Sequence, residues 1–187
     1  SHLITYLNDK NSSLRIKLIQ VITGVAVLLG PITLEQYILP LLIQTATDSE
    51  ELVVVTVLKS LKSLCTIGLI QKKYFFDISS IVSPLLLHPN IWIRQFSLIL
   101  LIEISHKLSK AEIYCLLYPI IRPYFEFDVQ LTWESMVSSC KKPVSRTVYN
   151  ILCTWSLRST NSLFWKQVPS KQKDSFGNSS AIFINKE

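Results

Sequence analysis

Four turn residues recur along the 187-residue chain at intervals of 39, 40 and 40 residues: Asp9, Asp48, His88 and Asp128. Apolar residues keep the same register. One column stacks Leu14, Val53, Ile93 and Trp133, and others stack Leu18 with Val57, Ile22 with Leu61 and Leu101, and Val25 with Leu64 and Ile104. Self-similarity at about 40 residues is typical of stacked helical pairs. The chain is therefore predicted to be all-α, an α-solenoid of about four repeats with the first repeat truncated.

Apolar spacing and turn residues predict where the helices lie. We expect them near residues 2–8, 14–29, 33–46, 51–67, 73–87, 91–108, 110–125 and 131–140, with one more amphipathic helix at about 144–158. This divides the chain into a repeat array at 1–140, a C-terminal helix with an apolar cluster at 141–165, and a polar, basic tail at 166–187 that is predicted to be mobile.

Glycine and proline mark breaks in this pattern. Gly30 and Gly68 are predicted to end helices, because glycine adopts the left-handed conformation without a Cβ clash. Four prolines fall in the first helices of their pairs, where the missing N–H group is expected to bend the helix: Pro40, Pro84, Pro119 and Pro123.

Helix starts carry capping signals. Thr33–Gln36 and Ser109–Glu112 are predicted to be capping boxes, in which two side chains satisfy N–H groups at a helix start. Asp48 with Glu51 gives a similar signal.

The composition raises the question of a membrane span, because 49% of the residues are apolar and 17% are charged. A span needs about 20 consecutive apolar residues. The longest uncharged runs, Leu18–Leu34 and Ile78–Ile93, contain glycine or proline breaks, so we interpret both as pairs of buried helices. Helix 14–29 is apolar nearly all round, which predicts cover on two sides. Gly24 within it either permits a close helix approach or is merely tolerated.

The chain opens inside an apolar helical pattern, without methionine or a basic flank, so it is expected to be a fragment without a visible signal peptide. Four cysteines without paired spacing favour a reducing, cytoplasmic setting. His2, His88 and His106 are too scattered to supply a zinc site or a catalytic base. No glycine-rich phosphate loop is present either, so no catalytic, cofactor or metal residue is predicted.

Charge is distributed unevenly along the chain. Residues 1–134 hold 11 basic and 11 acidic side chains, whereas residues 135–187 hold 8 basic and 2 acidic ones. The basic quarter is either a solvated linker or a surface for an acidic partner or anionic lipid. Nucleic acid is not an expected partner, since the repeats carry no basic stripe.

The repeat length and the paired helices resemble HEAT repeats. A closer resemblance is carried by four segments: Tyr6–Lys10, Leu34–Pro40, Leu86–Arg94 and Lys142–Arg146. They are similar to the HEAT segment of the protein-kinase-like regulatory subunits of class III phosphatidylinositol 3-kinase, a family acting in vacuolar protein sorting and autophagy. The similarity covers nearly all of residues 1–165 and is greatest to the budding-yeast member.

That resemblance implies a longer polypeptide, with an N-myristoylated serine/threonine-kinase-like domain before this segment and a WD-repeat propeller after it. It also implies partners: the lipid-kinase catalytic subunit, and a Beclin-type subunit paired with an autophagy- or endosome-specific one. The expected location is cytoplasmic and peripheral on endosomal, Golgi and autophagic membranes. The segment itself is expected to be a non-catalytic scaffold.

The alternative hypothesis is that the basic C-terminal quarter binds anionic lipid or nucleic acid, with the solenoid as support. The candidate partner-binding residues are Trp92, Arg94, Lys141, Lys142, Arg146, Phe164 and Trp165. For two of them a structural role is an open alternative: Trp92 packs into the next turn, or Arg94 bonds a neighbouring turn.

Overall fold

The computed structural model describes residue 7 and residues 9–161, with side chains described as far as Trp155. Apart from Leu7, the helix predicted at 2–8 lies outside the described residues, as does the tail at 166–187. The chain forms two compact units, residues 1–149 and 150–187. Across the described residues the regular elements are helical, with one isolated antiparallel bridge between Phe125 and Cys140. The predicted all-α, solenoid-like fold is confirmed.

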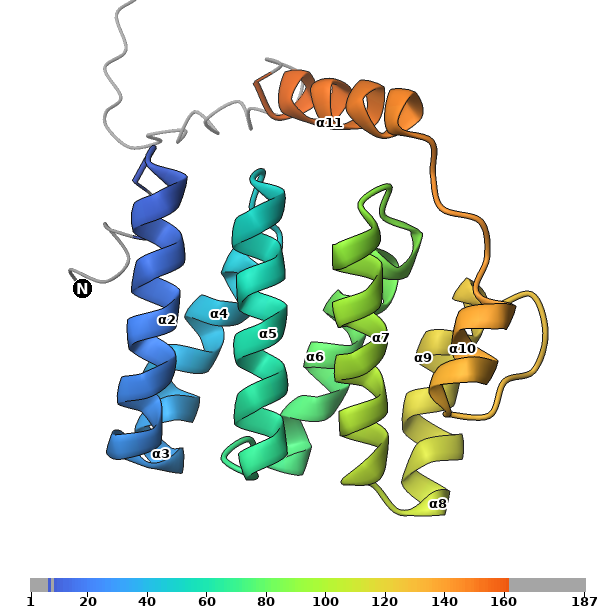
Figure 1. Cartoon of the computed structure of the whole chain (residues 1–187), viewed down its shortest axis with the longest axis horizontal. Coiled ribbons are helices and arrows are strands. Elements are labelled where there is room, and N and C mark those ends of the chain that lie inside the picture. Colours follow the sequence, from blue (N-terminus) through green and yellow to red (C-terminus); the bar gives the residue numbers. More distant parts are fainter. Residues whose placement is uncertain (1–6, 8, 162–187) are drawn as a thin grey trace, which may run out of the picture. The chain divides into compact units, whose positions relative to one another are not determined.

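Three long helices stand side by side in the first unit (Figure 1): α2 (Ser12–Leu29), α5 (Glu51–Ile67) and α7 (Ile91–His106). α5 packs against both α2 and α7, and the short α10 (Trp133–Ser139) packs against α7. Gly30 and Gly68 end α2 and α5 as predicted, each at a φ of 82°. The Gly68 N–H group donates to the carbonyl oxygens of Leu64 and Cys65, which caps α5.

The first helix of each pair is broken into short pieces, of which α4 and α6 lie behind the long helices in Figure 1. In the second repeat the pieces are α3 (Pro31–Thr33), a π-helical turn (Leu34–Ile38) and α4 (Leu39–Thr45). In the third they are a 3₁₀ turn (Lys72–Tyr74), α6 (Phe75–Val82) and a second 3₁₀ turn (Ser83–Leu87). In the fourth they are α8 (Lys110–Glu112), a π-helical turn (Ile113–Leu117), α9 (Tyr118–Ile121) and a 3₁₀ turn (Arg122–Tyr124).

The prolines explain these breaks. Each π-helical turn directly precedes an X-Pro pair, Leu39-Pro40 or Tyr118-Pro119. The Leu39 N–H group donates to the carbonyl five residues earlier, that of Leu34, and Tyr118 bonds equivalently. Proline cannot donate a backbone hydrogen bond, so the wider turn accommodates the interruption. The prolines therefore interrupt the first helices, as the sequence predicts.

The apolar columns form the core of the middle repeats. The α5 and α7 members are 1% exposed or less: Val53, Val57, Leu61, Leu64, Ile93, Leu101 and Ile104. The α2 members of the same columns are more open, with Leu14 38% and Val25 41% exposed. The prediction that helix 14–29 is covered on two sides is therefore wrong for the described residues, since a long helix packs against it on the α5 side alone. A Cβ added at Gly24 would meet nothing within 4 Å, so that glycine is tolerated rather than required.

α2 is also the one helix among the described residues that is long and apolar enough to cross a bilayer by length and composition. Core helices of globular proteins pass the same test. Here Ile19, Ile22 and Ala26 are buried in the shared core of the array. The Leu18–Leu34 run does divide into two helices at Gly30, as we interpreted it, but only 22% of α2 is buried, so the expected burial of both helices is wrong for α2.

One of the three capping predictions is confirmed and two are wrong. At Ser109, the side chain accepts from the Glu112 N–H group and the Glu112 carboxylate accepts from the Ser109 N–H group, which confirms that capping box. The box at Thr33–Gln36 is wrong, because Pro31 starts the helix two residues earlier and leaves Thr33 inside it. Asp48 does not cap α5, whose N-cap is Glu50.

Candidate docking site at the turn edge of the array

The recurring turn residues have one local task in three of the four repeats. Asp9, Asp48 and His88 each accept a hydrogen bond from the backbone N–H group two residues further on, at 2.8, 2.8 and 3.0 Å. Short side chains that accept from the backbone in this way stabilise turns. His88 uses Nδ1 as the acceptor and so replaces a carboxylate oxygen. Burial lowers the pKa of His88, which favours this neutral, accepting form.

Asp128 keeps the sequence register but makes different bonds. Its carboxylate accepts from the Tyr118 hydroxyl at 2.9 Å and from Arg122 Nε at 2.8 Å. The Gln130 N–H group donates to Ser135 Oγ instead of to Asp128. The repeated turn therefore ends before the fourth repeat, where the second helix is only the seven-residue α10.

Two arginines fasten the turns from the first turn of the following helix. Arg15 Nη1 donates to the Asp9 carbonyl at 2.5 Å, and Arg94 Nη1 donates to the His88 and Pro89 carbonyls at 2.8 Å. Arg15 also pairs with the carboxylate of Asp48 in the next repeat, at 2.9 Å. The side chain of Arg94 thus has a structural role, but it bonds its own turn and not the neighbouring turn considered above.

Two further ion pairs connect successive first helices. Lys73 Nζ lies 3.2 Å from the buried Glu35 of the second repeat, and Lys72 Nζ lies 3.1 Å from Glu112 of the fourth. Hydrogen bonds from Ser109 lower the pKa of Glu112 to about 2, and Lys72 adds to this effect. These pairs join repeats that already share the apolar core.

The chain returns along the turns after α10. We call residues Lys141–Tyr149 the strap. The Lys141 N–H group donates to the Tyr124 carbonyl at 3.0 Å, and Lys141 Nζ donates to the Pro123 carbonyl at 2.7 Å. The Val144 N–H group donates to the Leu87 carbonyl at 2.9 Å. The strap therefore bonds first the fourth repeat and then the third.

At its far end the strap reaches the second repeat. Arg146 forms an ion pair with Glu51, at the start of α5, and the same carboxylate accepts from Asn90 Nδ2 at 2.5 Å. The Tyr149 ring meets the His88 ring edge-on, with centroids 4.6 Å apart. The hydrogen bond from Arg146 lowers the pKa of Glu51, helped by the bond from Asn90. One carboxylate thus links the strap to two repeats.

The predicted contact residues can now be placed. Arg94, Lys141 and Arg146 lie on this edge with intramolecular partners, while Lys142 is exposed and Trp92 is 59% exposed, so its indole is not packed into the next turn. Phe164 and Trp165 lie outside the described residues. Partner binding by any of these residues stays a prediction.

Sequence reasoning missed Glu51, Asn90 and Tyr149 as members of the network. The spacing of the turn residues had marked His88, and two of the four segments that carry the family resemblance, Leu86–Arg94 and Lys142–Arg146, meet here. What the sequence could not supply was the pairing of Arg146 with a carboxylate 95 residues away.

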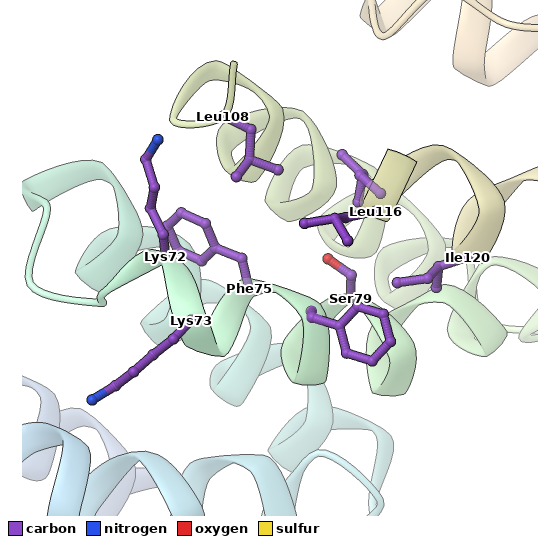
Figure 2. A pocket seen from close by; sticks show the side chains of 9 residues that line it. Lys72, Lys73, Phe75, Ser79, Leu108, Leu116 and Ile120 are labelled. Atoms are coloured by element: carbon purple, nitrogen blue, oxygen red, sulfur yellow. The ribbon is translucent and has the colours of Figure 1, made fainter. Parts of the chain in front are cut away.

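The first helices of the third and fourth repeats border a small apolar cleft. It holds about 120 Å³ between the Lys72–Val82 segment and the Ile113–Ile121 segment. Figure 2 shows the Ser79 hydroxyl pointing into it, while Lys72 and Lys73 extend away. Ser79 Oγ is buried without a hydrogen-bond partner. In the part of the chain that the structure describes, no group of three His, Cys, Asp or Glu side chains converges as a metal site would require.

Stacked helical pairs joined along one edge define an α-solenoid, a class that presents extended surfaces to other proteins. Residues 1–153 match the family described as PIK3R4-like, middle domain, and the chain belongs to that family. The resemblance found in the sequence is thereby confirmed.

Individual relatives agree with this assignment. The chain is 67% identical over 126 residues to "Serine/threonine-protein kinase VPS15" of Saccharomyces cerevisiae, covering 67% of the chain and 9% of that protein. It is 55% identical over 186 residues to a "non-specific serine/threonine protein kinase" of Candida glabrata, covering 100% of the chain and 13% of that protein. A "Putative serine/threonine-protein kinase VPS15" of Komagataella pastoris is 46% identical over 134 residues, covering 71% of the chain and 10% of that protein. The chain thus spans only about a tenth of the length of these relatives.

Proposed function

We propose that this chain is a non-catalytic scaffold and docking segment of the regulatory subunit of a class III phosphatidylinositol 3-kinase complex acting in autophagy and in endosomal and vacuolar protein sorting. The kinase domain after which its relatives are named lies outside these residues. The proposed partners are the lipid-kinase catalytic subunit and a Beclin-type subunit with its pathway-specific companion. The proposed location is cytoplasmic and peripheral on endosomal, Golgi and autophagic membranes.

The observation that carries the proposal is that hydrogen bonds and an ion pair fasten the strap along the turns of the array. The strap makes contact with the fourth, third and second repeats in turn, through Lys141, Val144 and Arg146. Repeats that are joined to one another in this way can hold flanking domains at a set separation, which is a geometric role that requires no catalytic group.

The test is to replace residues 12–149 in the full-length protein by a flexible Gly/Ser linker of similar length and to purify the lipid kinase with it. A flexible chain does not hold its ends at a fixed distance. We expect the lipid kinase to be lost from the purified complex, or to stay with reduced activity. An intact complex with full lipid-kinase activity would refute the scaffold role.

A further inference from the structure

α11 (Arg146–Asn161) presents an apolar stripe that stays exposed among the residues whose side chains the structure describes. Ile151, Leu152 and Trp155 are 62%, 52% and 69% exposed, and Val148, one turn earlier in the same helix, is 48% exposed. Residues at i, i+3, i+4 and i+7 lie on one helix face. The polar residues Thr147, Asn150 and Thr154 occupy other positions around the helix. α11 is therefore amphipathic, with its apolar side open.

After Tyr149, the described side chains of α11 lack the packing that normally sustains a helix. From Asn150 to Trp155 every side chain is exposed. An isolated helix of about 15 residues is marginal in water, and most helices in proteins are held by burial of an apolar face. A surface that takes up Ile151, Leu152 and Trp155 would supply that burial.

The charge of the chain around α11 indicates what kind of surface could cover the apolar stripe. The array at residues 1–134 has equal numbers of basic and acidic side chains, whereas residues 135–187 have 8 basic and 2 acidic ones. Lys142, which precedes α11, is exposed and lies in this basic quarter of the chain. An exposed apolar stripe with tryptophan, in a basic part of the chain, suits a helix that lies in the interface of an anionic membrane.

We propose that α11 lies in the surface of an anionic phospholipid bilayer, with Ile151, Leu152 and Trp155 inserted among the lipids and the exposed Lys142 near the headgroups. This goes beyond the scaffold role and does not depend on it. Tryptophan suits the boundary, because its ring is apolar and its N–H group remains near water. The helix gains stability from the bilayer as it inserts.

The structure also shows which residues must be left alone in a test. Lys141 donates to the Pro123 carbonyl and Arg146 pairs with Glu51, so reversing either charge would disturb the strap as well as any lipid contact. The informative changes are on the apolar stripe itself. A matched control is available in α2, where Leu28 is 86% exposed and far from α11 in the sequence.

The experiment is flotation of the 187-residue chain with vesicles of phosphatidylcholine alone or with about 30% phosphatidylserine. We compare the unaltered chain with Ile151→Glu, Trp155→Glu, the conservative Trp155→Leu and the control Leu28→Glu. Circular dichroism melting of each variant reports whether the array remains folded.

We expect binding to the anionic vesicles only, and about tenfold weaker partitioning for Ile151→Glu and Trp155→Glu, because each removes one inserted apolar side chain and adds a charge. Trp155→Leu and Leu28→Glu should bind like the unaltered chain. Binding should fall in about 0.5 M NaCl, where the Debye length is roughly 4 Å.

Three results would overturn the proposal. The chain does not float with anionic vesicles, which would leave the stripe to a protein groove. The Glu variants of α11 float as well as the unaltered chain. Or Leu28→Glu abolishes binding, which would assign the membrane contact to α2. None of these results bears on co-purification with the lipid kinase, so the scaffold proposal can fail or survive separately.

Discussion

Asp48 should be worth more to stability than its counterpart one repeat earlier, and replacing each by asparagine measures the difference. Asparagine keeps the Oδ1 acceptor for the backbone N–H group two residues on, so Asp9→Asn and Asp48→Asn both preserve the turn. Only Asp48 bonds an arginine of another repeat through its carboxylate; Asp9 bonds Arg15 through its main-chain carbonyl. The pair of variants therefore isolates the contact between repeats.

The burial of this ion pair sets the magnitude. The side chains of Arg15 and Asp48 are 8% and 12% exposed. Removing one member of a buried pair costs about 3–5 kcal/mol. Asparagine still accepts a neutral hydrogen bond from the guanidinium, so we expect Asp48→Asn to lower the free energy of unfolding by about 2 kcal/mol. Asp9→Asn, at an exposed position, should change it by less than about 0.5 kcal/mol.

The assay is urea unfolding of the 187-residue chain, followed by circular dichroism, with equal m-values as the check that both variants unfold from a comparable state. If Asp48→Asn is no more destabilising than Asp9→Asn, the recurring turn residues serve local turn geometry alone and do not connect the repeats.

Three further predictions concern single sites. Because burial lowers the pKa of His88, the unfolded chain takes up a proton more readily than the folded one. The free energy of unfolding should therefore be highest above the ordinary histidine pKa of about 6.5 and should fall as the pH drops from there towards the pKa of the folded state. Urea titrations between these pH values should show this decrease, and His88→Asn should lack it. Burial raises the pKa of the Cys65 thiol to about 11, so iodoacetamide at pH 8 should label the exposed Cys115 first and Cys65 only on unfolding, as read by mass spectrometry; early labelling of Cys65 would contradict its burial. Gly68→Ala should cost about 1 kcal/mol, because Gly68 has a φ of 82°, whereas Gly24→Ala in the middle of α2 should stabilise by up to about 1 kcal/mol, and equal effects in thermal melts would refute the distinction.

The helices themselves could be predicted closely, and the reason is local. Helix 51–67 was predicted with the bounds that α5 has, because its apolar spacing, the acidic residue at its start and Gly68 at its end all act within one turn of the residues concerned. The predicted capping box at Thr33 was wrong for an equally local reason. Proline is favourable at the first position of a helix, and Pro31 outweighed the capping signal.

Contacts across the array could not be predicted in the same way. Asp128 has the residue type and the register of the other turn residues, yet it bonds Tyr118 and Arg122, because the segment after it is not folded like the earlier turns. The pairing of Arg146 with Glu51 depends on the path that the chain takes between these two residues, which no local sequence pattern encodes. The openness of α2 likewise depends on which neighbours are present rather than on its own composition.

In our proposal, the hydrogen bonds and the ion pair that fasten the strap to the turns give the segment the fixed geometry that a scaffold requires. The most direct measurement is a charge swap in the full-length protein: Glu51→Arg, Arg146→Glu and the double variant, each purified with its bound lipid-kinase activity. We expect each single change to reduce the associated activity, since it sets two like charges against each other at the strap, and the double variant to restore it. Undiminished activity in both single variants, or no recovery in the double variant, would contradict the account.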